Sequence, residues 1–423
     1  MNIGIFTDTY YPQINGVATS VMMLDKELTK LGHKVYIFTT SDPKATRSNP
    51  KVFRLPSMPF VFLPSNRFAL LYPPRLLMKM KRFKLDIIHT QTEFPLGIFG
   101  KIVSEFYRIP LVHTYHTMYE DYVHYIARGR IVSPKMAQRY SRIFCNRAKA
   151  VITPVQKSKD KLASYGVIRP IYVIPTGIDF TPFSRDAYSQ EDINAIKREL
   201  GIAPGAPVLV SVGRLAKEKS VDVIVRQIPK VLEQIPDLKF VVVGDGPYKE
   251  KLMEMVAELR IRDAVIFTGS RPWSEIGKYY QLGDAFVCAS TSETQGLTYI
   301  ESMAAKTPVI AKRDPSIEGI VRHGITGFCF DDDVDAAEAI CAAMSDKAEM
   351  QRIAENAYAS IQFLSSENFG KNLETCYREI IAQPDTGQKP RKKQPQSKNL
   401  SRTQMPQMMW IRGMSQKLKP PKK

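Results

Sequence analysis

Two glutamates, Glu293 and Glu301, stand eight residues apart in a stretch that could contact a sugar. The stretch opens with apolar Ala285–Val287, turns polar until about Gly296, and resumes as a helix-like segment that stops before Pro308. This order predicts a strand, a loop and a helix, with the free N–H groups of the helix N-terminus facing a ligand. A carboxylate there repels phosphate but accepts hydrogen bonds from the vicinal hydroxyls of a ribose or hexose. The residues therefore predict a nucleotide-sugar as the ligand.

Two cations follow another predicted strand and complete this chemistry. Arg214 and Lys219 lie five residues apart, after the apolar run Val208–Val212 and Gly213. A diphosphate gains charge as its bond to a sugar breaks, and cationic side chains stabilise that charge. We therefore expect Arg214 and Lys219 to contact a diphosphate.

In the first half of the chain, a glycine and a histidine also follow predicted strands at positions that could contact a ligand. Gly16 lies between an apolar strand and a helix whose apolar residues recur from Val17. At such a strand-to-helix turn, a glycine lets the backbone approach a ligand. His116 follows the predicted strand 110–114, at the edge where open α/β sheets bind ligands. Its neutral imidazole could orient a sugar hydroxyl, although a purely structural role stays open. The spacing of the histidines does not match a metal motif.

Strand–glycine–helix units recur in both halves, so the chain is predicted to be an α/β protein with two doubly wound parallel sheets. The absence of G-x-G-x-x-G disfavours a dinucleotide site. The predicted parts are residues 1–175, a first Rossmann-like domain that faces the acceptor and the membrane; 176–362, a second that binds the nucleotide-sugar; 363–383, a helix; and 384–423, a disordered basic tail rich in Gln, Pro, Lys and Ser.

Composition places the chain among ordinary globular proteins. It has 423 residues, of which 44% are hydrophobic and 24% charged. No apolar run approaches the roughly 20 residues that span a bilayer, and the first residues predict a strand rather than a signal peptide. Its five cysteines lack C-x-x-C spacing, which argues against a disulfide framework or zinc site and favours a reducing cytoplasm.

The net charge of +18 is unevenly distributed. Residues 1–175 carry 26 Lys and Arg against 10 Asp and Glu, whereas residues 384–423 carry 11 against 1. The residues between them are acidic, with 23 against 31. This distribution predicts that the first half and the tail face a polyanion, either an anionic membrane or a nucleic acid.

A basic amphipathic helix is predicted from about Pro74, with apolar residues on one face and cations beside it. This layout is typical of a helix that lies in a membrane interface, although a helix packed on the core with solvated lysines gives the same pattern. The membrane-binding residues are predicted to be Arg75, Leu76, Lys79, Met80, Lys81, Arg82, Phe83 and Lys84. A second membrane-seeking turn at 408–411 and solvated disorder are equal alternatives for the tail.

The spacing E-x7-E from Glu293 to Glu301 resembles the signature of retaining glycosyltransferases of family 4, which have the two-domain GT-B fold around a central cleft. The resemblance extends over residues 1–383 and implies that the final helix crosses back onto the first domain. It also implies that Glu293 contacts the transferred sugar, Glu301 the ribose, and His116 the sugar from the acceptor side. The donor-binding residues implied are Gly16, Arg214, Lys219, Ser270, Arg271, Glu293, Gly296, Leu297 and Glu301, and the catalytic ones His116, Glu293, Arg214 and Lys219.

The phrases FTDTYYPQINGV, YHTMYEDY and SETQGLTYIES most resemble the bacterial diacylglycerol glucosyltransferases of that family. This resemblance implies transfer of glucose from UDP-glucose to the 3-hydroxyl of 1,2-diacylglycerol, as in synthesis of lipoteichoic acid anchors, by an enzyme peripheral on the inner face of the cell membrane. The expected partners are UDP-glucose, diacylglycerol and anionic lipids, without nucleic acid. No cofactor is implied as a requirement, and Mg²⁺ is at most stimulatory. Two alternatives stay open: a GDP-mannose-dependent mannosyltransferase acting on a phosphoinositide or other lipid, and a basic nucleic-acid-binding protein.

Overall fold

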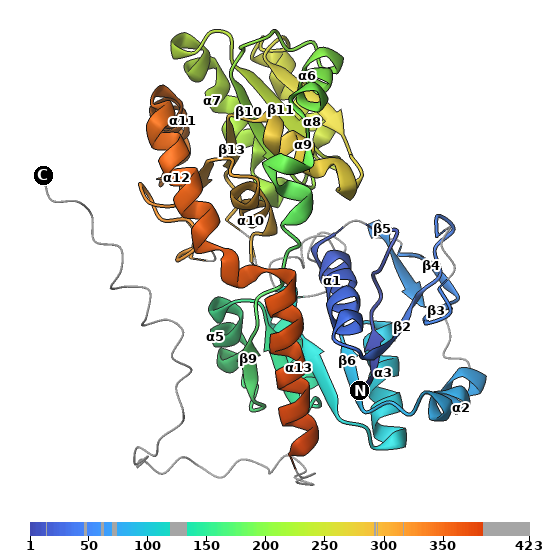
Figure 1. Cartoon of the computed structure of the whole chain (residues 1–423). Coiled ribbons are helices and arrows are strands. Elements are labelled where there is room, and N and C mark those ends of the chain that lie inside the picture. The colour runs from blue at the N-terminus through green and yellow to red at the C-terminus, as the bar shows by residue number, and fades with distance from the viewer. Residues whose placement is uncertain are drawn as a thin grey trace, which may run out of the picture. The chain divides into compact units, whose positions relative to one another are not determined.

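A computed structural model describes residues 1–13, 15–45, 49–60, 63–69, 74–118, 133–291, 293, 295–315 and 317–383. Residues 1–383 form one compact unit, shown in Figure 1. Residues 119–122, the second half of the phrase YHTMYEDY, and the whole predicted tail lie outside the described residues.

The first sheet has the strand order β3-β2-β1-β6-β7-β8-β9, and every neighbouring pair is parallel. Its strands are β1 (Asn2–Phe6), β2 (Lys34–Thr40), β3 (Val52–Leu55), β6 (Ile87–Thr90), β7 (Leu111–Thr114), β8 (Ala150–Thr153) and β9 (Ile171–Val173). The intervening helices are α1 (Gly16–Lys30), α2 (Pro74–Phe83), α3 (Pro95–Tyr107), α4 (Pro134–Cys145) and α5 (Gln156–Ser164). A separate antiparallel hairpin joins β4 (Ser57–Phe60) to β5 (Leu63–Ala69).

The second sheet is also parallel, in the order β12-β11-β10-β13-β14-β15. Its strands are β10 (Val208–Val212), β11 (Lys239–Val243), β12 (Val265–Gly269), β13 (Ala285–Cys288), β14 (Val309–Lys312) and β15 (Phe328–Phe330). The helices that follow the first sheet are α6 (Gln190–Glu199), α7 (Val221–Gln234), α8 (Lys249–Glu258), α9 (Trp273–Leu282), α10 (Leu297–Ala304), α11 (Ala336–Ser345), α12 (Lys347–Ser360) and α13 (Ser366–Ala382). The two sheets confirm the predicted α/β class with two doubly wound, Rossmann-like domains.

The two faces of the first sheet are covered by different helices. On one face, Ile3 and Ile5 of β1 pack with α1 and with the buried side of α13, including Tyr377. On the other face, Phe6 packs with α3 and α2. This alternation follows from the period of two along a strand. Helix α13 comes after all strands of the second sheet yet lies along α1 (Figure 1), where Gly370 allows it to approach Glu27.

Candidate active site

The loop after β13 carries the first predicted carboxylate to the N-terminus of α10. Gly296 precedes α10 and has φ 69° and ψ 56°, a left-handed conformation that favours glycine. A Cβ at this position would also lie only 2.6 Å from Cδ2 of Tyr299. The glycine therefore lets the chain turn abruptly into α10, whose first N–H groups have no partner within the helix.

Glu293 and Lys219 meet in the folded protein although 74 residues separate them. Lys219 Nζ lies 2.6 Å from Oε1 of Glu293, and Glu293 is only 8% exposed. Lys219 closes the short helical turn η6 (Lys217–Lys219) after β10. The pair brings the predicted diphosphate cation and the predicted sugar carboxylate to one place.

Arg214 lies on the same loop as Lys219 and forms an ion pair with Glu218. The backbone oxygen of Glu218 also accepts a hydrogen bond from Ser290 Oγ, at 3.4 Å, so this loop is tied to the loop that follows β13. Arg214 is exposed, which leaves its guanidinium accessible to a ligand. Thus the predicted cations both border the loop of Glu293.

Glu301 lies on the second turn of α10, where Tyr280 of α9 donates a 2.8 Å hydrogen bond to its Oε2. Burial raises the pKa of Glu301 to about 7, and the hydrogen bond from Tyr280 opposes that rise. The carboxylate has a second oxygen, which could accept from a ribose hydroxyl. Tyr280, which was not predicted, fixes the orientation of Glu301.

Gly16 and Leu297 bring two helix N-termini together. A Cβ built on Gly16 would lie 3.7 Å from Leu297 Cδ1. Gly16 begins α1, whose N-cap Asn15 accepts a 2.9 Å hydrogen bond from the N–H of Ala18 and donates one to Thr9. The starts of α1 and α10 therefore border the same place, and two helix dipoles there favour an anion.

Ser270 and Arg271 follow β12, and the structure packs them differently. Ser270 is exposed, whereas Arg271 forms a 3.2 Å ion pair with Glu199 and lies over the ring of Tyr279. These two contacts of Arg271 hold the turn against α6 and α9. Binding of the donor by Ser270 and Arg271 stays a prediction.

Gln295 is a buried site residue that the sequence did not single out. Its Oε1 accepts a hydrogen bond from the N–H of Thr176 and its Nε2 donates one to the Thr176 carbonyl, both at 2.8 Å. These two hydrogen bonds tie the Glu293 loop to the segment that joins the two sheets. In the sequence, only its position beside Gly296 indicated that Gln295 could lie at the site.

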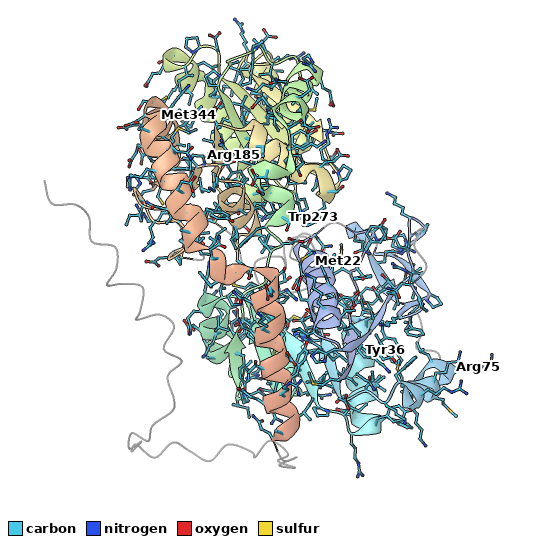
Figure 2. All side chains as sticks on the ribbon, viewed as in Figure 1. Met22, Tyr36, Arg75, Arg185, Trp273 and Met344 are labelled. Atoms are coloured by element: carbon cyan, nitrogen blue, oxygen red, sulfur yellow. The ribbon has the colours of Figure 1, made fainter. Side chains whose placement is uncertain are left out.

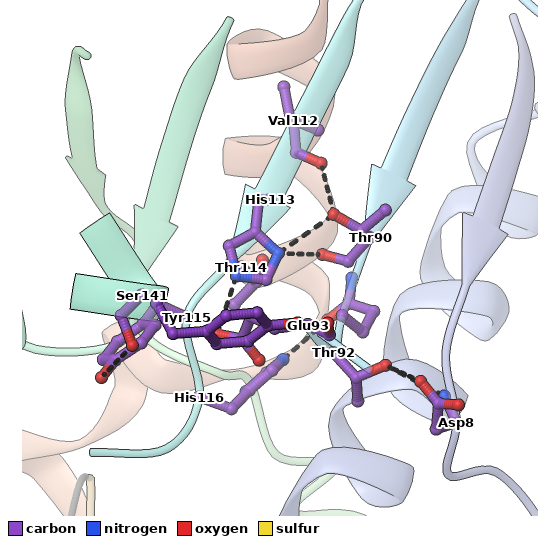
Figure 3. A network of polar contacts seen from close by, with 12 residues as sticks. Asp8, Thr90, Thr92, Glu93, Val112, His113, Thr114, Tyr115, His116 and Ser141 are labelled. Atoms are coloured by element: carbon purple, nitrogen blue, oxygen red, sulfur yellow. Dashed lines mark hydrogen bonds and ion pairs between the residues drawn. The ribbon is translucent and has the colours of Figure 1, made fainter. Parts of the chain in front are cut away.

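His116 lies at the edge of the first sheet, next to Tyr115 in the chain (Figure 3), and it contacts Gln91. His116 Nε2 lies 2.7 Å from Gln91 Oε1. Burial lowers the pKa of His116 to about 3, so the ring is neutral at physiological pH. Because an amide oxygen only accepts, Nε2 carries the proton and Nδ1 is left as an acceptor. The sequence did not single out Gln91 as a site residue.

A buried polar layer supports Gln91 and His116. His113 Nε2 lies 3.0 Å from Glu93 Oε1, and His113 is fully buried on β7, which confirms its expected place in a strand. His89 lies 2.5 Å from the hydroxyl of Tyr377 and 2.6 Å from Thr114 Oγ1. Burial holds the pKa of His89 well below its usual value. Through Tyr377, α13 becomes part of the support for this sheet edge.

Asp8 lies at the same sheet edge and has a raised pKa. It accepts hydrogen bonds from Thr92 Oγ1, at 2.6 Å, and from the N–H of Leu96 in the first turn of α3. Burial is the largest influence and raises its pKa to about 7. An aspartate in an unfolded chain ionises near pH 3.9. Between these values the folded protein binds more protons than the unfolded chain, so the free energy of unfolding falls as pH rises.

We therefore expect Asp8→Asn to stabilise the protein more at pH 8 than at pH 5. The amide oxygen can still accept the same hydrogen bonds, but no buried charge forms as pH rises. Calorimetric melting temperatures of the variant and the parent protein at both pH values provide the measurement. An equal difference at the two pH values would contradict the raised pKa of Asp8.

The structure corrects the predicted role of the apolar face of α2. Met80 is buried in the core of the first domain, and Leu76 and Phe83 are half-buried against the same cluster. Met80 is therefore not available to lipid, and Leu76 and Phe83 pack largely on protein. The cations remain outside, as Figure 2 shows for Arg75. The exposed cations of α2 and its end are Arg75, Lys79, Lys81, Arg82 and Lys84.

Within the described residues, no group of three or more His, Cys, Asp or Glu side chains is placed to hold a metal ion. In the same part of the chain, no helix is long and apolar enough to cross a membrane.

Comparisons with known proteins agree on both domains. Residues 14–181 match the family model described as Glycosyltransferase Family 4, and residues 192–360 match Glycosyl transferases group 1. An alpha-monoglucosyldiacylglycerol synthase of Streptococcus pneumoniae is 42% identical over 90% of this chain and 86% of its own. A second, from Acholeplasma laidlawii, is 33% identical over 90% and 98%. The crystal structure of Anabaena HepE with UDP and glucose aligns with a TM-score of 0.73 at 20% identity, covering 89% of this chain and 99% of HepE.

Proposed function

Because the chain belongs to glycosyltransferase family 4 and has its GT-B fold, we propose that it transfers glucose from UDP-glucose to the 3-hydroxyl of 1,2-diacylglycerol. Two relatives, 42% and 33% identical, are named for synthesis of α-monoglucosyldiacylglycerol, the product of this reaction. The observation that carries the proposal is the Lys219–Glu293 pair beside the N-terminus of α10. It offers a cation for a diphosphate and a carboxylate for sugar hydroxyls within 2.6 Å of each other.

The reaction exchanges one bond at the anomeric carbon for another on the same face of the sugar. The bond from C1 to the diphosphate oxygen breaks, the acceptor oxygen bonds to C1, and the hydroxyl proton passes to the departing phosphate. Lys219 and Arg214 stabilise the charge that develops on that phosphate, together with the N–H groups of α10. Glu293 holds the glucose hydroxyls in position. Because the acceptor attacks on the face from which the diphosphate departs, no covalent intermediate on the protein is needed.

His116 acts on the acceptor side as a neutral hydrogen-bond acceptor. Its Nε2 is occupied by Gln91, at 2.7 Å, so Nδ1 is the atom that meets a sugar hydroxyl. The low pKa of His116, about 3, keeps this acceptor available across the physiological range. The ring thereby orients the glucose without transferring a proton.

The side-chain cations supply the charge stabilisation, and we propose that no metal is required. We further propose that the enzyme binds the cytoplasmic face of the cell membrane through anionic lipids. Five exposed cations at and beside α2 support this, since each gains about 1 kcal/mol near an anionic surface.

The test is transfer of labelled glucose from UDP-glucose to diacylglycerol in mixed micelles containing phosphatidylglycerol, with and without a chelator. We expect a glucosylated lipid whose linkage is α by NMR. GDP-mannose with phosphatidylinositol serves as the competing substrate pair. Transfer from that pair alone would overturn the proposal, and a β-linked product would overturn the stereochemistry.

Glu301→Gln should raise the KM for UDP-glucose about tenfold with little change in kcat. A hydrogen bond to a charged group contributes about 1.5–3 kcal/mol, and a ribose contact exists before and during the reaction. Steady-state kinetics with varied UDP-glucose provide the measurement, and Glu355→Gln, on the exposed side of α12, is the matched control. A fall in kcat at constant KM would assign Glu301 to the transferred sugar instead.

A further inference from the structure

Helix α4 carries an exposed apolar stripe that no described part of the chain covers. Met136, Tyr140 and Ile143 recur at the spacing of one helix side and are 56%, 41% and 42% exposed. The side of α4 that faces the core is formed by other residues, including Ala137 and Phe144. Single exposed apolar residues are ordinary, but a contiguous set marks an interaction surface.

Helix α3 extends this apolar surface. Phe94, at the N-cap of α3, is followed at intervals of four by Ile98, Ile102 and Phe106, all exposed, with Phe106 at 66%. The ring of Phe68 on β5 lies 6.2 Å from that of Phe94 and adds to the same end.

Helices α3 and α4 contact each other where the start of α3 meets the end of α4, and we infer that their apolar stripes adjoin there. A Cβ at Gly97 of α3 would lie 3.2 Å from Cζ of Phe144 of α4. The hydroxyl of Tyr140 donates to the backbone oxygen of Glu93, just before α3. We call this surface, defined by Phe94, Ile98, Ile102, Phe106, Met136, Tyr140 and Ile143, the α3–α4 face.

Cations run beside the apolar stripe of α4. Lys135, Arg139 and Arg142 each precede one of its apolar residues, are exposed, and form a parallel stripe. Helix α4 contains no aspartate or glutamate. Apolar side chains flanked by cations on one helix are the layout of an interfacial helix, in which apolar groups enter the acyl boundary and cations meet anionic head-groups. This is the layout that the sequence predicted for α2, where the structure instead buries the apolar residues.

We propose that the α3–α4 face docks on an anionic lipid bilayer and delivers the site to the acceptor lipid, an inference that rests on the proposed function. The face begins at the site itself, because Phe94 directly follows Glu93, which lies 3.0 Å from His113. A lipid lying against Phe94 therefore starts next to the Glu93–His113 contact and three residues along the chain from Gln91, the partner of His116. The positive charge of α4 selects a bilayer containing anionic lipid over an uncharged one.

The test is co-sedimentation of the full chain with vesicles of phosphatidylglycerol and phosphatidylcholine. We expect the triple variant Phe106→Glu, Met136→Glu, Ile143→Glu to bind about tenfold more weakly, because acidic groups replace apolar ones at an anionic surface. The control is Ile325→Glu, Val334→Glu, which changes exposed apolar residues of the second domain and should bind as the parent protein does. Unchanged binding by the triple variant would overturn the proposal.

Activity separates this proposal from the proposed function. With diacylglycerol embedded in vesicles, the triple variant should lose activity in step with binding, while activity on a short-chain diacylglycerol dispersed in water should persist. A parent protein that binds vesicles through this face but glucosylates neither form would overturn only the proposed function. If the triple variant dissociates a dimer in light scattering and still binds vesicles, the face is a contact between two copies and the docking proposal is wrong.

A spectroscopic measurement avoids any effect of added charge on folding. Ile143→Trp should show a fluorescence blue shift when phosphatidylglycerol vesicles are added, because the indole enters a less polar environment. Val334→Trp, in the second domain, should show none. Equal responses from the two variants would contradict docking through α4.

Discussion

Lys219→Ala is expected to lower kcat about a hundredfold. A cation preorganised at a developing charge contributes about 3 kcal/mol to the transition state, and each 1.36 kcal/mol changes the rate about tenfold. In the structure, Lys219 Nζ already lies 2.6 Å from Glu293, so its position is set before the diphosphate arrives. The variant also leaves the nearly buried Glu293 without this partner, which adds to the loss.

The controls for this prediction use the same loop. Lys217→Ala removes an exposed cation two residues away in the same helical turn and should leave kcat nearly unchanged. Glu293→Gln should also lower kcat, because the glucose contact lies near the breaking bond. Since Lys219 and Glu293 touch, the double variant should lose less than the two single losses combined. Near-normal turnover by Lys219→Ala would remove the diphosphate assignment.

The parts of the fold that could be predicted have a local physical signal. The strand β10 has the predicted bounds, because an apolar run of this length before a turn residue identifies a buried strand. The start of α10 was also foreseen, since Gly296 supplies the left-handed residue that ends the preceding loop. These features depend on residues close together in the chain.

The contacts that create the site depend on long-range packing and could not be foreseen in the same way. The 2.6 Å approach of Lys219 to Glu293 and the two bonds from Gln295 to Thr176 join separate elements. Periodicity showed that Met80 shares a helix face with other apolar residues, but not that this face packs on the core. The β4–β5 hairpin and α4 were not predicted, so the exposed stripe on α4 went unnoticed.

His116→Ala is expected to lower kcat about a hundredfold with little change in the KM for UDP-glucose. The imidazole orients the transferred glucose, and a small misplacement of a reacting group can cost about a hundredfold. The predicted donor contacts at Lys219 and Glu301 remain, so donor affinity should persist. Steady-state kinetics with both substrates varied provide the measurement. A rise in the KM for UDP-glucose at unchanged kcat would show that His116 only binds the donor.

Gln91→Glu tests whether the tautomer and neutrality of His116 matter for this role. The new carboxylate would lie beside Nε2, where Gln91 Oε1 is now at 2.7 Å, and an opposite charge raises the pKa of an imidazole. Once protonated, Nδ1 can only donate and no longer accepts from a sugar hydroxyl. We therefore expect kcat of the variant to fall as pH drops from 8 to 5, more steeply than in the parent protein, whose His116 has a pKa of about 3.

Nitrogen NMR of the imidazole should follow the same change, with His116 neutral and protonated at Nε2 in the parent protein and positively charged at low pH in Gln91→Glu. The control is Gln190→Glu, which adds the same charge on the exposed start of α6 and should leave both the rate profile and the imidazole unchanged. A purely structural role for Gln91 would lower activity equally at every pH. A rate profile that follows the titration of the His116 imidazole would support control of the sugar contact by the charge state of His116.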